Sequence, residues 1–427
     1  MKKFFALSLF YLCALYGKTE KDWTIITYIA SDNDLNFFAR KNMDDMAKVG
    51  SNKWINILTQ VDAQHMGYTK RFYIEKHKIT QVNQHDASGN QKLDFGSATT
   101  LIDCLNWAIE NYPAKHYALV LWNHGIGILD NISGRSSDPS QLFNFNLQTS
   151  MLEINRSIGY FDFIKNNNKR GVCFSDTFGT YLTNKKLNYA LQAVTTKHGK
   201  KIDIIGFDAC LMGMFEMAQQ LEPFANYMTA SQELELGTGW PYAKVLEPFI
   251  HQTLSPEEFS KHIVEAYHQN YKNITYDYTL STVDLSNIPL VHESLNQTAD
   301  LLLNGLQYQV NSSITKLIRA SKSKRLCTHF SEPSYIDMHH FLSNLFEAIE
   351  FVELQQGHES IQPLLKESLN KTILYLEQAI IANQCGRNLA RARGLSIYFP
   401  IRYIDHSYYE APFVQTARWI FLLQALS

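Results

Sequence analysis

The chain has 427 residues, a formal net charge of −2 and 45% hydrophobic residues. This composition is that of a folded protein with a sizeable core, and it argues against a disordered chain. The near balance of 39 basic and 41 acidic residues argues against the basic surface that binding to nucleic acid or to an anionic membrane requires.

The first residues predict a targeting segment. Two lysines at the start precede an apolar stretch over residues 4–15, and polar residues follow it. The stretch is too short to span a bilayer comfortably and suits a secretory signal peptide, which we assign to residues 1–17. Two alternatives stay open: a short uncleaved N-terminus, and lipid attachment at Cys13, although Leu12 is larger than the residue expected there. No later apolar stretch is long enough for a transmembrane helix.

Strands and helices alternate in the first half of the chain. Short apolar, β-branched runs predict strands over residues 23–30, 54–61, 71–75, 117–122, 201–207 and 225–230. Apolar residues at helical spacing predict helices over residues 37–49, 99–110 and 212–221. This alternation predicts an α/β layer architecture with a mostly parallel sheet.

The pattern breaks between residues 129 and 176, where polar, loop-forming residues dominate. A connection of this length inside a domain is usually functional or mobile. From about residue 255 the chain predicts mainly helices, with strand character returning over residues 394–400. We therefore expect one domain over residues 18–254, which contains the long loop 129–176, and a mainly helical C-terminal region over residues 255–427.

Two of the predicted strands run directly into a chemically reactive residue. The apolar residues 119–122 lead to His124, and the apolar residues 204–207 lead to Cys210. In an open α/β sheet, sites form at the carboxyl ends of the strands. A histidine and a cysteine placed at this edge can lie side by side, although they are far apart in the sequence.

A cysteine and a histidine at this edge suit nucleophilic catalysis. An imidazole near a thiol raises the fraction of thiolate, and a helix starting directly after Cys210 would add the field of its N-terminus. Gly125, which follows His124, lets the backbone approach a substrate carbonyl, and the amides of Gly125 and Cys210 are candidates for an oxyanion hole. Each feature also has a plain structural explanation, because buried free cysteines are usually core residues and a His-Gly pair often forms a turn.

The cysteine pattern favours a free thiol over a metal site. No CxxC pair occurs, so a zinc ribbon is not expected. An odd number of cysteines in an exported chain leaves at least one thiol unpaired. After residues 1–17 are removed, five cysteines remain: Cys104, Cys173, Cys210, Cys327 and Cys385.

At these residues the chain resembles the clostripain family of cysteine peptidases, relatives of caspases, legumain and gingipain. The motifs that carry the resemblance are YIASDNDL at 28–35, NHG at 123–125, SDT at 175–177, DACLM at 208–212, ASQE at 230–233, GTGWP at 237–241 and ARGLSIYFP at 392–400. The resemblance implies a caspase-like α/β/α sandwich in which His124 and Cys210 form a catalytic dyad. One departure is Ile126, where a small polar residue is expected.

The resemblance also implies cleavage after Arg or Lys. Asp208, two residues before Cys210, would place a carboxylate at the base of the S1 pocket, where it would recognise a guanidinium by charge-assisted hydrogen bonds. Glu233 and Glu235 have a weaker claim to line the same pocket. The alternative for Asp208 is a residue of a turn or a helix cap.

Members of the family are often cut in the loop between the histidine and the cysteine. We expect this cut at Lys169 or Arg170 in the loop 129–176, because the three asparagines before them favour a flexible segment. An uncut surface loop is the alternative. Calcium is associated with some members, but the chain has only scattered acids (Asp32, Asp34, Asp62 and Asp176) and no EF-hand loop, so no calcium site is located.

The sequence thus predicts a secreted or periplasmic cysteine endopeptidase that hydrolyses peptide bonds after Arg or Lys. We expect protein or peptide substrates, a monomer, no required cofactor, no nucleic-acid partner and no membrane span. Two alternatives stay open: a peptidase of the same fold with specificity for Asn or Asp, and a binding protein that keeps the fold without catalysis.

Overall fold

The computed structural model describes residues 19–63, 67–82, 91–130, 142–157, 159, 172–307, 311–351, 355–356 and 359–427. The predicted signal peptide and the predicted processing residues Lys169 and Arg170 lie outside these ranges. None of the helices within them is both long and apolar enough to cross a bilayer.

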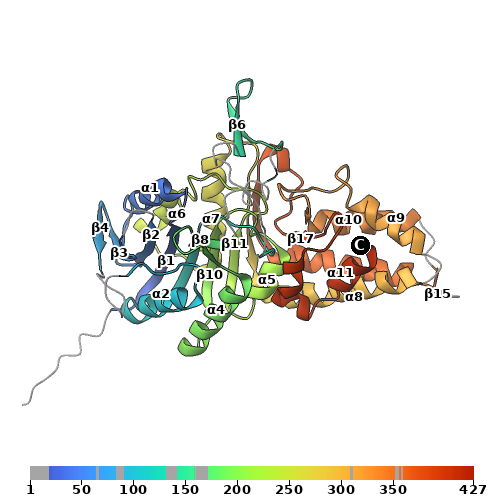
Figure 1. Cartoon of the computed structure of the whole chain (residues 1–427), viewed down its shortest axis with the longest axis horizontal. Coiled ribbons are helices and arrows are strands. Elements are labelled where there is room, and N and C mark those ends of the chain that lie inside the picture. The colour runs from blue at the N-terminus through green and yellow to red at the C-terminus, as the bar shows by residue number, and fades with distance from the viewer. Residues whose placement is uncertain are drawn as a thin grey trace, which may run out of the picture.

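A mixed sheet crosses the molecule, with strand order β16-β12-β11-β10-β5-β1-β2-β3-β4 (Figure 1). Its strands are β1 (Lys21–Ser31), β2 (Ile55–Ala63), β3 (Lys70–Glu75), β4 (Lys78–Gln81), β5 (Ala114–Trp122), β10 (Ile202–Asp208), β11 (Ala225–Ala230), β12 (Thr279–Asp284) and β16 (Ile380–Cys385). The five central strands, from β11 to β2, are parallel, and the two strands at each edge are antiparallel.

Both faces of the central strands are buried, which explains why their sequences are almost continuously apolar. Along β5, Leu119 and Leu121 belong to one apolar core, whereas Ala118 and Val120 belong to the core on the opposite face. The first core includes side chains of α2 (Ala98–Asn111), α4 (Asn184–His198) and α5 (Phe215–Leu221). The second includes side chains of α1 (Asn36–Met46), α6 (Tyr242–Leu246) and α7 (Pro256–Tyr271). The architecture is therefore the expected α/β/α sandwich.

A group of helices follows at the β16 end of the sheet (Figure 1). It consists of α8 (Ile288–Gln307), α9 (Asn311–Ser321), α10 (Met338–Ala348), α11 (Gln362–Ala379) and α12 (Trp419–Leu426), with the antiparallel pair β13 (Tyr335–Asp337) and β17 (Ser396–Tyr398) beside them. These helices share the first apolar core with the sheet.

The central sheet extends beyond residue 254, where the sequence places the end of the first domain. Strands β12 and β16 come from the region that the sequence predicts as mainly helical. Strand β12 reads TLSTVD and lacks a clear apolar pattern, and β16 follows α11 directly, so the helical spacing conceals it. The other predicted strands and helices are confirmed with ends shifted by a few residues, except that the helix after Cys210 begins later than predicted.

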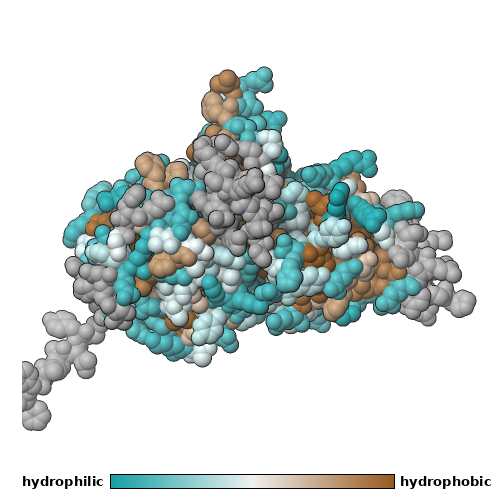
Figure 2. Space-filling view, viewed as in Figure 1, coloured by the Kyte–Doolittle hydropathy of each residue, from teal (hydrophilic) through white to brown (hydrophobic). Residues whose placement is uncertain are grey.

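Short hairpins occur in and around the long loop. They are β6 (Phe143–Asn146) with β7 (Met151–Ile154), and β8 (Val172–Ser175) with β9 (Thr180–Leu182); a two-residue pair, β14 (Gln355–Gln356) and β15 (Glu359–Ser360), lies near α11 in sequence. Figure 2 shows a mostly hydrophilic surface on this face, with hydrophobic residues on the projecting β6–β7 hairpin. Of these, Phe145 is 59% exposed and Leu147 is 85% exposed.

Asp337 ties the C-terminal helices to the sandwich. Its side chain is fully buried and caps α10 by accepting a hydrogen bond from the His340 amide at 2.8 Å. It also accepts from the Gln232 side chain at 3.0 Å and from the Arg393 amide at 2.6 Å. Three donors from separate segments thus depend on one carboxylate, and each would be left unpaired without it.

We expect Asp337→Ala to lower the free energy of unfolding by about 2–4 kcal/mol, because it removes a helix cap and leaves buried donors unsatisfied. Urea denaturation of the two proteins measures this difference. The control is Glu377→Ala: this exposed acid pairs with His339 at 2.8 Å, and its loss should cost less than about 1 kcal/mol. If the two variants lower the free energy of unfolding equally, Asp337 does not hold the C-terminal helices to the sandwich in the way described.

Candidate active site

The register of β5 and β10 brings the two predicted site segments together. The strands pair in parallel up to Trp122 opposite Asp208, and the Asn123 amide donates to the Asp208 carbonyl at 3.2 Å. His124 and Cys210 follow within two residues of this last contact. The same sheet edge therefore carries both predicted catalytic residues, as expected from the sequence.

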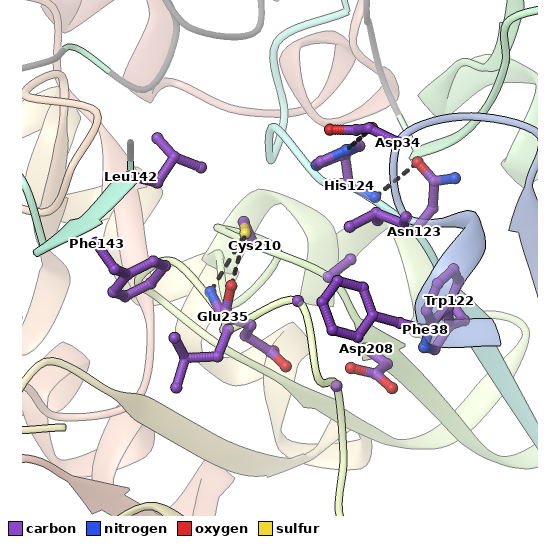
Figure 3. Close-up of a pocket in the computed structure, with 15 residues that line it drawn as sticks. Asp34, Phe38, Trp122, Asn123, His124, Leu142, Phe143, Asp208, Cys210 and Glu235 are labelled. Atoms are coloured by element: carbon purple, nitrogen blue, oxygen red, sulfur yellow. Dashed lines mark hydrogen bonds and ion pairs between the residues drawn. The ribbon is translucent and has the colours of Figure 1, made fainter. Parts of the chain in front are cut away.

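His124 and Cys210 line one cavity of about 460 Å³, within the range of small-ligand sites (Figure 3). Among the described residues, its walls are formed by Asp34, Leu35, Phe38, Trp122, Asn123, His124, Leu142, Phe143, Asp208, Ala209, Cys210, Glu235, Leu236, Gly237 and Gly239. The set combines aromatic and aliphatic walls with acidic groups, and it contains no Lys or Arg.

The His124 ring is buried and held by hydrogen bonds at the end of β5. Its Nε2 lies 2.9 Å from Asp34 Oδ1, and its backbone amide donates to the Asn123 side chain at 2.6 Å. Burial lowers the pKa of His124 to about 4, and the Asp176 carboxylate acts in the opposite direction. At neutral pH the imidazole is therefore uncharged and able to accept a proton.

The Cys210 thiol lies in a tight turn beside the segment that follows β11. The Glu235 amide donates to Cys210 Sγ at 3.2 Å, and the Glu235 carbonyl lies 3.8 Å from the same sulfur. An amide directed at the sulfur favours the thiolate form. The turn places Leu211 at a φ of +62° and is held by a hydrogen bond from its amide to the Glu233 carbonyl at 3.2 Å.

The prediction that a helix begins directly after Cys210 is wrong. Helix α5 begins at Phe215, five residues after the thiol, because the intervening backbone bonds to the segment after β11 and to β17 instead. The Gly213 amide, for example, donates to the Ser231 carbonyl at 2.7 Å. The dipole of a helix N-terminus therefore does not act on the thiol in the way that the sequence predicts.

Gly125 is required by the close packing of the two site segments. A Cβ atom at this position would lie 2.4 Å from the Cys210 carbonyl oxygen and 2.9 Å from Met212 Cγ. The glycine therefore allows the backbone after His124 to pass directly against the turn that carries Cys210.

Asp208 is buried and lines the same cavity as His124 and Cys210. Its carboxylate accepts hydrogen bonds from the Trp240 amide at 3.0 and 3.1 Å and from the Tyr242 hydroxyl at 2.8 Å. Burial raises the pKa of Asp208 to about 6, and these donors act against that rise. Gly239 keeps the approach open, because a Cβ there would lie 2.8 Å from the carboxylate.

The two candidate glutamates occupy different environments. Glu235 lines the cavity, whereas Glu233 does not belong to its described walls. Glu233 lies 3.5 Å from Arg156 of the long loop and accepts a hydrogen bond from the Ser331 amide at 3.1 Å. Arg156 also pairs with Asp277 at 3.1 Å. Of the two, Glu235 is the one placed to meet a bound ligand.

The scattered acids are drawn together by the sheet edge. The Lys92 ammonium lies 2.8 Å from Asp32 and 3.7 Å from Asp62, so both carboxylates already face a cation of the protein itself. Asp34 contacts His124 instead. Within the described ranges, no group of three or more His, Cys, Asp or Glu side chains is arranged to hold a metal ion.

Several site residues were not singled out from the sequence as catalytic or pocket residues. Asp34 carries no pattern that distinguishes it from the neighbouring acids, and only the register of β1 beside β5 places it against His124. Phe38, Leu142 and Phe143 form apolar walls of the cavity. The described cysteines are all free thiols, and Cys210 is the one that lines the cavity.

Comparisons with known proteins identify the family of the chain. The clostripain family model matches residues 27–146 and 159–424. Clostripain from Hathewaya histolytica is 22% identical over 433 aligned positions, which cover 88% of this chain and 74% of that protein.

Two solved structures share the fold. A secreted C11 cysteine protease from Bacteroides thetaiotaomicron, in complex with an irreversible peptide inhibitor, gives a TM-score of 0.62 at 19% identity, with coverage of 94% of this chain and 99% of the other. An inactive zymogen C11 protease from Parabacteroides distasonis gives 0.58 at 18% identity, with coverage of 93% and 99%. With a family match over most of its length, the chain belongs to the clostripain family and is a cysteine-type peptidase.

Proposed function

We propose that this peptidase is an exported endopeptidase that cleaves after Arg or Lys and is activated by its own cut in the loop 129–176. The observation that supports basic specificity is the buried carboxyl of Asp208, which lines the same cavity as His124 and Cys210. No Lys or Arg among the described wall residues competes with a basic substrate side chain. An acidic P1 residue would be repelled there.

The mechanism follows from the positions of the groups. His124, uncharged at neutral pH, accepts the thiol proton while Asp34 holds its Nε2 side. The thiolate of Cys210 attacks the scissile carbonyl and forms an acyl-enzyme, and the imidazolium then protonates the leaving amine. The amides of Gly125 and Cys210 are proposed to stabilise the oxyanion. A water molecule finally hydrolyses the acyl-enzyme.

Export is supported by the N-terminal sequence, and activation by the anchoring of the loop on both sides of its predicted cut. Before the cut, the Leu152 amide donates to the Ile274 carbonyl at 2.8 Å and Arg156 pairs with Glu233 and Asp277. After it, β8 is buried beside β1. A cut at Lys169 or Arg170 would therefore leave both new ends attached. We propose a monomer that requires no cofactor.

We expect Cys210→Ala to lose at least about a thousandfold in hydrolysis of a fluorogenic Arg peptide, because the nucleophile is gone. Intact mass spectrometry should show the wild type split within the loop 129–176 and the variant as one chain. Cys385→Ala is the matched control, since this half-buried thiol lies outside the cavity walls and should retain both activities. An active Cys210→Ala protein would rule out the proposed nucleophile.

We expect Asp208→Asn to reduce kcat/KM for an Arg substrate by about 100-fold, because a charge-assisted partner of the P1 side chain becomes neutral. The same substitution should change hydrolysis of the uncharged citrulline analogue much less. Glu233→Gln is the control: with its side chain outside the cavity walls, KM should stay within about threefold. If Asp208→Asn lowers kcat/KM equally for the Arg and the citrulline substrate, Asp208 does not determine basic specificity.

The pH profile should separate the pocket from the catalytic base. Asp208 is ionised above its raised pKa of about 6 and neutral below it, so kcat/KM for Arg substrates should fall as pH decreases through about 6. His124, with its pKa lowered to about 4, should limit activity only at lower pH. Profiles for Arg and citrulline peptides between pH 4.5 and 8 test this: identical acid limbs would assign the fall to the catalytic groups rather than to the pocket.

A further inference from the structure

Glu235 places a second carboxyl in the pocket beside Asp208. The residue is buried, with 8% of its surface exposed, and both acids line the cavity (Figure 3). The Glu235 carboxyl lies beside the Asp208 carboxyl, and hydrogen bonds with the Asp208 side chain, the Trp240 indole and the Ala209 amide act on its pKa. Two neighbouring buried carboxyls that line a cavity without a cation of their own indicate a position for a cationic ligand group.

The surroundings of this acid pair contain no compensating cation among the described residues. Tyr242 donates to Asp208, and Tyr267 and Tyr271 lie close enough to be affected by the charges of both acids. The other titratable groups that line the cavity are Asp34, His124 and Cys210.

Two neighbouring carboxyls in such a site cannot both ionise without a partner. Burial raises the pKa of Glu235 well above its usual range, and the charge of Asp208 raises it further. The empty pocket therefore holds one proton at neutral pH, on Glu235, while Asp208 is ionised. The pair carries a single negative charge.

We propose that Glu235 is a second specificity-determining acid, which exchanges its proton for the cation of the P1 side chain when a substrate binds. The proposal rests on the basic specificity proposed above. The step is balanced: the Glu235 carboxylic acid loses a proton to solvent, and an arginine cation enters. Before binding, the site contains one carboxylate and one acid; afterwards it contains two carboxylates and one cation, so its net charge is −1 in both states.

The exchange favours arginine over lysine. A guanidinium presents five N–H donors in a planar fork and can bridge two carboxylates, whereas an ammonium is a compact point charge with three donors. Asp208 alone would satisfy one edge of the guanidinium. Once it has released its proton, Glu235 supplies acceptors for further donors of the guanidinium.

The backbone of Glu235 links this pocket to the nucleophile. Its amide donates to Cys210 Sγ at 3.2 Å, so the residue that meets the P1 side chain also holds the thiol. A substitution of the side chain leaves this amide in place. Loss of selectivity in Glu235→Gln can therefore be separated from loss of the nucleophile.

Proton release on binding tests the exchange directly. A peptide with Arg at P1 is titrated calorimetrically at pH 7.5, in buffers of different ionisation enthalpy, into the Cys210→Ala protein after the wild-type enzyme has cut it in the loop 129–176. We expect about one proton to be released per peptide bound. With Glu235→Gln added, release should fall to near zero, whereas Glu233→Gln should leave it unchanged. In the catalytically competent chain, Glu235→Gln should reduce the preference for Arg over Lys in kcat/KM by about tenfold.

The outcomes separate this proposal from the proposed function. Cleavage after Arg together with peptide binding that releases no proton in Cys210→Ala would overturn the exchange and leave basic specificity intact. That measurement does not depend on Glu235→Gln folding. Equal proton release with and without Glu235→Gln would also overturn it. Failure of the wild type to cleave after either Arg or Lys would instead overturn the proposed function on which the exchange rests.

Discussion

The hydrogen bond from the Asn123 amide to the Asp208 carbonyl is the contact around which the site is built. It lies at the end of the pairing between β5 and β10, and the two segments stay in close contact beyond it at Gly125 and Cys210. His124 lies one residue past this hydrogen bond on one strand, and Cys210 lies two residues past it on the other. A shift in register of one residue would turn these side chains to opposite faces of the sheet. The apolar side chains on both faces of β5 and β10 prevent that shift, so the core fixes the catalytic geometry.

The same edge of the sheet brings several largely buried acidic side chains together, and each has a different kind of partner. Asp32 and Asp62 face the Lys92 ammonium. Asp34 faces the His124 ring, where its carboxylate would stabilise an imidazolium if His124 accepts a proton as proposed. Asp208 is held by a backbone amide and a tyrosine hydroxyl, which supply dipoles but no positive charge. Its negative charge is therefore still available to attract a cation.

The sequence predicted what depends on local pattern. His124 and Cys210 could be found because each follows a buried apolar strand, and the resemblance to the clostripain family supported their pairing. Strands β12 and β16 could not be found in this way, because a strand near the edge of the sheet that contains polar residues has no clear apolar periodicity. The role of Asp34 depends on the pairing of β1 with β5, which brings residues 90 positions apart into contact. The start of α5 was misplaced because long-range backbone hydrogen bonds compete with the helix after Cys210.

Glu233 and Glu235 show why sequence alone could not choose between the acids. They are two residues apart, and both are buried in segments rich in polar groups. Glu233 has Arg156 as a partner, so its charge is compensated within the protein and a substrate would have to displace that arginine to reach it. Glu235 has no such partner among the described residues, and it lies in the cavity. A buried acid that lacks its own cation costs stability, and the binding of a cation from outside recovers it. Arg156 of the long loop pairs with Glu233 and not with Glu235. This pairing is what separates the acid that is compensated within the protein from the acid that we propose binds the substrate.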